Sequence, residues 1–171
     1  LWNKLMDGGK VLMPIDKYPW SERYGWVQDR YGMTWQVSVV YKQGDKQQIT
    51  ASMLFTGKQF GKAEEAIKLY TSVFDSSSTD TLIHYMEGDA NAGKVMFSEF
   101  KLNQYPLIAM DGPGEHAYSF NEAVSLVVNC DTQDEIDHFW ERLTADGGQE
   151  SMCGWLKDKF GVSWQIVPTV L

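Results

Sequence analysis

Few side chains in this sequence could do acid–base chemistry, and they lie well apart. Glu99 sits in the alternating apolar–polar run 95–102, and His116 sits in a loop rich in Gly and Pro. A carboxylate in an apolar pocket can act as a general base, and a histidine can carry protons near neutral pH. Each also has an ordinary interpretation: Glu99 as an exposed strand residue beside Lys101, and His116 as a residue that fixes a connection. These two residues are the candidates for catalysis.

The sequence shows no nucleophile or metal cluster with a recognisable spacing. Its two cysteines, Cys130 and Cys153, have no base or cation beside them, and we expect both to be small buried thiols. There is no CxxC pair and no Cys/His cluster of zinc spacing. The turn 57–61 lies between a predicted strand and a predicted helix, but it is too short to be a nucleotide-binding loop. We therefore predict no cofactor.

Composition excludes several classes of protein. The chain has 171 residues, of which 43% are hydrophobic, and its charge is −8 from 15 Lys or Arg and 23 Asp or Glu. An acidic surface repels phosphate backbones, so we expect no nucleic-acid partner, and the charge serves solubility. No apolar run is long enough for a membrane span, and we expect the first residues not to be a signal peptide. Two cysteines do not make a disulfide scaffold, which favours a reducing cytoplasm.

An internal repeat defines the elements that must position the candidate residues. Residues 25–37 and 154–166 are identical at six of thirteen positions, and a Trp-x-x-Leu run precedes each copy at 2–5 and 140–143. Each copy is typical of a helix end, a Gly-rich turn and three strands. Residues 1–44 therefore predict an αβββ segment.

The remaining chain predicts two β-α-β-β-β units, 49–112 and 121–168. Apolar residues at helical spacing predict a helix over Lys62–Phe74, and Thr132 with Glu135 forms a capping box for the second helix. The strands are expected at 49–56, 81–86, 95–102 and 107–110 in the first unit. In the second they are expected at 123–130 and as three short strands after the helix, the last of them at 163–167 behind a hairpin turn.

This arrangement resembles the vicinal oxygen chelate superfamily, which includes glyoxalase I, extradiol dioxygenases and bleomycin-resistance proteins, and within it the PhnB-like branch. The stretches 61–66, 121–126 and 153–168 carry the resemblance. It implies an α+β fold in which paired βαβββ units form a cupped mixed sheet with helices on the outer face. Residues 49–171 would be a complete two-unit domain, and 1–44 the C-terminal part of a preceding unit. Tandem versions exist in the family, which leaves open whether the natural chain is longer at its N-terminus.

The resemblance also implies four metal-ligand positions, on the first and last strands of each unit. They fall near Ala51 and Ala109, at Ala123 or Ser125, and at Gln165. Methyl groups cannot ligate a metal, and one amide is no site. We therefore expect the metal site to be degenerate, with no metal bound. Branch members are often labelled demethylubiquinone methyltransferases, but nothing in the sequence supports that activity.

Strand alternation sorts the residues expected around the cup. Trp164 should lie in the core, and Phe97, Glu99, Ser125 and Gln165 should face the cup, where Met53 and Phe55 add apolar surface. The first functional hypothesis is a protein that binds a small apolar or aromatic ligand in a pocket between residues 49–112 and 121–168. The second is a metal-independent enzyme of the same fold, and the third is a structural dimer module without ligand.

Residues 1–40 predict a homodimer. They would lack the first strand of their unit and leave an open sheet edge, which invites pairing with another chain. The segment could also dock on its own chain. We favour pairing with a second copy through an interface that includes residues 25–40.

Overall fold

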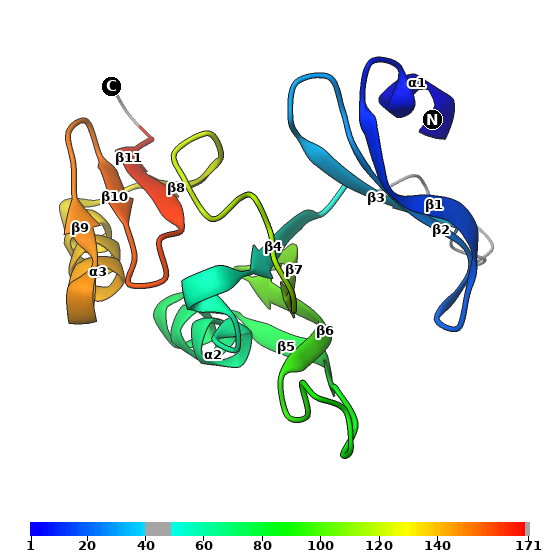
Figure 1. Cartoon of the computed structure of the whole chain (residues 1–171). Helices are drawn as coiled ribbons and strands as arrows, with labels where there is room; N and C mark the ends of the chain where they lie inside the picture. The colour runs from blue at the N-terminus through cyan, green and yellow to red at the C-terminus, as the bar shows by residue number, and fades with distance from the viewer. Residues whose placement is uncertain (40–48, 170–171) are drawn as a thin grey trace. The chain divides into compact units, whose positions relative to one another are not determined.

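The computed structural model describes residues 1–39 and 49–169 and divides the chain into two compact units, residues 1–48 and 49–171 (Figure 1). The expected boundary at residue 44 and the end of the expected interface, Val40, lie outside the described residues. In the part of the chain that is described, no helix is long and apolar enough to cross a membrane.

The first unit is a short helix followed by a three-stranded antiparallel sheet in the order β1-β2-β3. Its elements are α1 (Trp2–Met6), β1 (Lys10–Tyr18), β2 (Ser21–Gln28) and β3 (Thr34–Ser38). Gly25 allows the helix to approach β2, because a Cβ atom there would lie 2.6 Å from the Trp2 ring. The αβββ order expected from the repeat is therefore present.

The second unit begins with a four-stranded sheet in the order β4-β7-β6-β5, in which only the β4–β7 pair is parallel. Its elements are β4 (Ala51–Phe55), the 3₁₀ helix η1 (Gly57–Gln59), α2 (Ala63–Val73), β5 (Ser78–His84), β6 (Val95–Leu102) and β7 (Tyr105–Asp111). Strand β5 begins and ends earlier than expected, because it pairs with β6 from Ser78 onward.

A second sheet repeats the same order, β8-β11-β10-β9, again with one parallel pair, β8–β11. Its elements are β8 (Ser125–Cys130), α3 (Gln133–Thr144), η2 (Ala145–Gly147), β9 (Gln149–Glu150), β10 (Trp155–Lys157) and β11 (Ser163–Pro168). Helix α3 begins with the expected capping box between Thr132 and Glu135. Two consecutive β-α-β-β-β units confirm the predicted α+β fold class.

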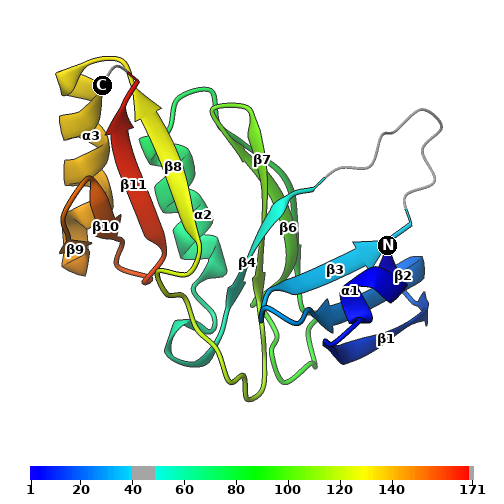
Figure 2. The ribbon, with the colours of Figure 1, turned by 90° about the horizontal axis from the view of Figure 1, so that it is seen from above.

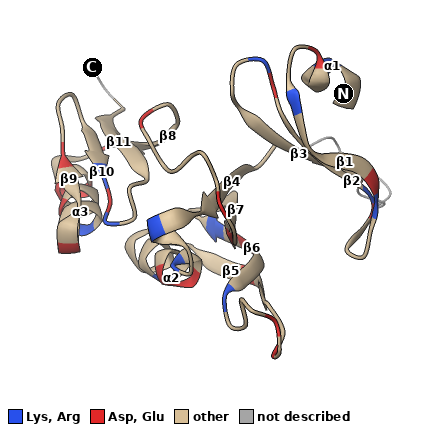
Figure 3. Cartoon of the chain, viewed as in Figure 1, with Lys and Arg blue, Asp and Glu red and all other residues tan. Residues whose placement is uncertain are grey.

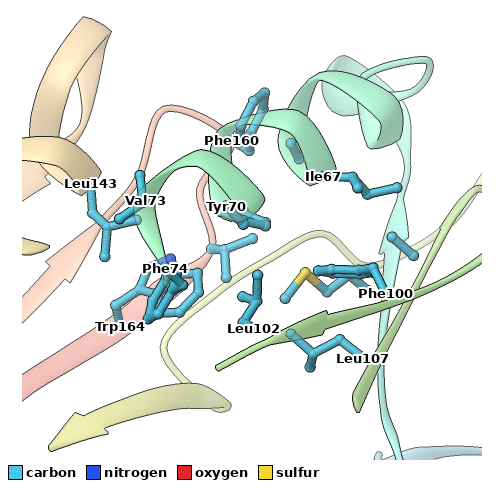
Figure 4. Packing of buried hydrophobic residues seen from close by; sticks show 14 of the residues in the cluster. Ile67, Tyr70, Val73, Phe74, Phe100, Leu102, Leu107, Leu143, Phe160 and Trp164 are labelled. Carbon is cyan, nitrogen blue, oxygen red and sulfur yellow. The ribbon is translucent and has the colours of Figure 1, made fainter. Parts of the chain in front are cut away.

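The two sheets of the second unit share one hydrophobic core. Helix α2 lies along the first sheet and α3 along the second (Figure 2), and both helices contribute to the same buried cluster. Trp164 of β11 is buried, as expected. Its ring stacks on Phe74 at 5.6 Å and meets the edge of Tyr70 at 5.2 Å (Figure 4). The side chain of His138 on α3 adds a hydrogen bond to the Val73 carbonyl at 2.9 Å.

The repeated Asp-x-aromatic-Gly turn has the same hydrogen bonds in both copies. Asp158 Oδ1 accepts from the backbone N–H groups of Phe160 and Val162 at 2.9 and 3.0 Å, and its Oδ2 accepts from Trp164 Nε1 at 2.9 Å. In the first unit, Asp29 accepts from Tyr31, Met33 and Trp35 at 2.9, 3.0 and 2.9 Å. The recurring Asp and Trp of the repeat therefore tie each hairpin turn to its following strand.

Candidate functional site

A polar cluster lies on the face of the second sheet opposite Trp164. Side chains alternate along β11, so Gln165 and Trp164 point to opposite faces. Gln165 Nε2 donates a 2.7 Å hydrogen bond to Ser125 Oγ on the neighbouring strand. Trp155 is the ladder partner of Gln165, and Lys157 is the partner of Ser163, which places both side chains on this same face. The predicted strand parity is confirmed here, and two predicted site residues are in direct contact.

A hollow of about 320 Å³ lies on the second sheet, beside this cluster. Its lining residues include Trp155 and Lys157, and the Lys157 ammonium is paired with the Glu122 carboxylate. A further carboxylate, that of Glu150, accepts a 2.9 Å hydrogen bond from Trp140 Nε1. The lining residues are Glu122, Gln149, Glu150, Ser151, Trp155, Leu156, Lys157 and Ser163. All of them lie within residues 121–168. The sequence predicted a pocket between residues 49–112 and 121–168 that Gln165 lines, so this hollow is not the predicted pocket.

Two of the residues expected to line the cup lie in the core instead. Met53 is 6% exposed and Phe55 is fully buried, and both pack in the cluster with α2. Phe55 meets the rings of Phe120 and Phe160 edge-on at 5.0 and 6.0 Å. The expectation for these two side chains is wrong, because β4 turns its odd-numbered residues toward the helix.

Phe97 and Glu99 lie on the face of β6 opposite the buried Phe100, as strand alternation predicts. Glu99 is exposed and accepts a 3.3 Å hydrogen bond from Thr81 Oγ1. It belongs to the first sheet of residues 49–171, whereas Ser125 and Gln165 belong to the second.

His116 is half-buried in the loop between β7 and β8, which connects the two β-α-β-β-β repeats of residues 49–171. Its Nε2 lies 3.2 Å from the Pro113 carbonyl, and its ring is 5.4 Å from that of Tyr118. Burial raises the pKa of the Tyr118 phenol. These contacts hold the loop that carries His116.

The residues at the expected metal positions do not fit a metal ion. Ala109 is 1% exposed in the core, and Ala51 packs against the same cluster. Gln165 is engaged with Ser125. Within residues 1–39 and 49–169, no group of three or more His, Cys, Asp or Glu side chains could hold a metal ion. We therefore derive no chemistry through a metal.

The two cysteines differ in a way that the sequence did not indicate. Cys130 is buried, as expected, and burial raises the pKa of its thiol. Cys153 is exposed, because it lies in the turn before β10 with a left-handed φ of 58°. The prediction of two buried thiols is wrong for Cys153.

Trp155, Lys157 and Glu122 are the site residues that sequence reasoning missed. The signal was available, since Trp155 and Lys157 alternate around the buried Leu156 and precede a hairpin. Strand alternation alone would have placed both on the face of Gln165.

Paired β-α-β-β-β units of this strand order define a glyoxalase-like protein. The family model described as 3-demethylubiquinone-9 3-methyltransferase matches residues 1–38 and 47–167. The chain therefore belongs to this family, and the predicted PhnB-like assignment is confirmed.

Solved structures agree with this assignment. The chain is similar to the PhnB protein from Bacillus cereus at 34% identity, with a TM-score of 0.63, over 72% of this chain and 100% of that one. A protein from Pseudomonas aeruginosa shares the fold at 19% identity and a TM-score of 0.58, over 72% and 98% of the two chains. Among curated proteins, no relative matches.

Proposed function

We propose that the second unit binds a small, flat organic molecule without a metal ion, on the face of the second sheet that carries Trp155 and Gln165. The observation that carries this proposal is the hollow of about 320 Å³ beside the Gln165–Ser125 hydrogen bond. Ligand pockets usually start at about 300 Å³ and combine apolar surface with a few polar groups that orient the ligand.

Each group on this face has a defined task in the proposal. The Trp155 ring offers a flat surface on which an aromatic ligand stacks. The pair Gln165–Ser125 uses one amide N–H and one oxygen in its mutual bond, which leaves an amide carbonyl, a second amide N–H and a hydroxyl proton for a polar ligand group.

Charge favours a neutral or cationic ligand over an anion. Lys157 is already paired with Glu122, and Glu150 adds a second carboxylate to the wall. A ligand carboxylate would be repelled by these carboxylates, and the one cationic lining residue, Lys157, is already paired.

The family label invites a comparison with methyl transfer, which this site does not support. The N–H groups of Gly61 and Ala63, after the turn 57–59, donate to Asp111 Oδ1 at 2.8 and 3.2 Å. These amides bind the chain's own carboxylate, so the turn is an anchor for α2 and not a cradle for a nucleotide-like cofactor.

Three probes with the same ring test the proposal: benzamide, benzylamine and benzoate. We expect benzamide or benzylamine to shift the Trp155 indole signal in NMR spectra of the full chain, and benzoate to shift it least. Zn²⁺, Ni²⁺ and Mn²⁺ should leave it unchanged.

Binding to the variants is followed by NMR signals of the ligand itself. Trp155→Ala should abolish the change in these signals. Trp20→Ala is the matched control and should leave it intact, because Trp20 is 62% exposed in the first unit. Saturable binding of benzamide or benzylamine that persists in the Trp155→Ala variant would contradict the proposal. Binding that requires a metal ion would contradict it as well.

A further inference from the structure

Three side chains in register form a row across the second sheet. Gln165 on β11 has Trp155 of β10 as its ladder partner on one side and Val127 of β8 as its ladder partner on the other. Ladder partners share a face of the sheet, with their Cβ atoms about 5 Å apart. We call Trp155, Gln165 and Val127 together the Gln165 row. It places one amide group between two apolar surfaces, of which Val127 is 55% exposed.

The amide of Gln165 is held in one orientation. Its Nε2 donates to Ser125 Oγ at 2.7 Å, and Ser125 is a diagonal neighbour on β8, because its own ladder partner is Ser163. This bond uses one of the two amide N–H groups, so a ligand can use the second N–H and the lone pairs of Oε1. The Gln165 row therefore presents one donor and one acceptor side by side in the plane of a fixed amide.

The groups that β8 and β11 offer to a ligand are neutral. Neither strand contains a charged residue (Figure 3). An amide that presents a donor and an acceptor is complementary to a ligand edge that presents an acceptor and a donor. A carboxylate offers acceptors alone and an ammonium offers donors alone, so each leaves one atom of the Gln165 amide without a partner.

The close spacing of the row favours a ligand whose polar edge is part of its ring. A ring that lies on Trp155 brings its edge to Gln165, the ladder partner of Trp155. In a cyclic cis-amide, or lactam, the N–H and the C=O are neighbours in the ring plane, so no rotation about a side bond has to be frozen on binding. Glutamine reads the donor–acceptor edge of a nucleobase in the same two-bond manner.

We propose that the Gln165 row recognises a planar heteroaromatic lactam. The ring stacks on Trp155, the lactam N–H donates to Gln165 Oε1, and the second N–H of Gln165 Nε2 donates to the lactam carbonyl. This ligand class rests on the binding proposed above for the same face, and it makes Gln165 the residue that determines specificity. Ser125 is a positioning residue, because it acts through the Gln165 amide.

Quinolin-2-one and its N-methyl derivative test the proposal, because they share one flat ring system and differ at the lactam N–H. NMR titration of the full chain, followed by the Trp155 indole signal, gives both dissociation constants. We expect quinolin-2-one to bind about 10-fold more tightly, since the methyl group removes one hydrogen bond and leaves Gln165 Oε1 unpaired. Gln165→Met keeps the length of the side chain without its amide, and it should bring the two constants to within about twofold.

Gln133→Met is the matched control, because Gln133 is exposed on α3 and does not line the hollow. It should keep the preference for quinolin-2-one. A preference that persists in Gln165→Met overturns the proposal, because another group would then read the lactam. Equal binding of the two quinolinones to the wild type also overturns it, and binding of benzamide or benzylamine would then leave the proposed function intact. If none of the four compounds binds, both proposals are overturned.

Discussion

Asp29 and Asp158 occupy the same position in the two copies of the repeated turn, and they show how the surroundings of an aspartate set its pKa. Asp158 is 3% exposed, and burial raises the pKa of its carboxyl above the ordinary 3.8 despite the hydrogen bonds of Tyr70 and Trp164. Asp29 makes the matching bonds near solvent, and the Trp35 hydrogen bond lowers the pKa of its carboxyl. The extent of desolvation therefore sets whether the pKa of this aspartate is raised, as in Asp158, or lowered, as in Asp29.

The first prediction is a pH-dependent stability that comes from Asp158. A carboxyl with a raised folded pKa binds its proton more tightly in the folded state, so its contribution to stability falls as pH rises from about 3.8 through the folded pKa. The stability of the wild type relative to Asp158→Asn should therefore decrease over that window, as measured by urea unfolding. Carboxyl NMR titration should place Asp158 above 3.8 and Asp29 below it, and parallel stability curves would show that the assignment is wrong.

Helix α2 ties the two halves of the second unit together. Tyr70 on α2 donates a 2.6 Å hydrogen bond to Asp158 Oδ2 in the β10–β11 turn, and both groups are buried. On the first sheet, Asp111 at the end of β7 accepts the N–H groups at the start of the same helix. One helix thus receives a carboxylate from each sheet.

Tyr70→Phe should destabilise the second unit by about 1–3 kcal/mol, because it keeps the ring and leaves a buried carboxylate oxygen short of one donor. Denaturant unfolding measures the loss. Tyr105→Phe, at an exposed tyrosine, should stay within about 0.5 kcal/mol of the wild type. Equal effects of the two substitutions would show that the buried hydrogen bond contributes nothing.

Thr132→Ala should destabilise the second unit by about 0.5–2 kcal/mol through loss of the α3 cap. Thr132 Oγ1 accepts a hydrogen bond from the Glu135 N–H at 3.2 Å, and the Glu135 carboxylate accepts one from the Thr132 N–H at 3.4 Å. Thr132→Ser keeps the hydroxyl and should retain most of the stability in the same unfolding experiment. If serine and alanine were equally destabilising, the methyl group and not the cap would be responsible.

Local patterns predicted the elements better than the site. Alternation placed Trp164 and Gln165 on the correct faces, and the capping box fixed the start of α3. Strand alternation gave the wrong face for Met53 and Phe55. Both faces of β4 carry apolar residues, so its sequence does not show which face meets the helix. The Tyr70–Asp158 bond spans 88 residues of sequence, so no local pattern could indicate it.

At the scale of the whole chain, the two units differ in how many buried hydrophobic residues each contains. Every residue of the buried hydrophobic cluster belongs to residues 49–171. In the described part of the first unit, Val27 is the hydrophobic side chain that is fully buried. A segment of 48 residues with so little core is marginal by itself, since small domains bury too little surface to offset chain entropy.

Deleting residues 1–48 should therefore leave a folded second unit. We expect the fragment 49–171 to retain the near-ultraviolet circular dichroism of its buried Trp164 and a melting temperature within a few degrees of that of the full chain, because the deletion removes no residue of the cluster. The isolated segment 1–48 should be largely unfolded in the same assay. A fragment 49–171 that unfolds at room temperature would show that the second unit depends on the first, contrary to the distribution of its core.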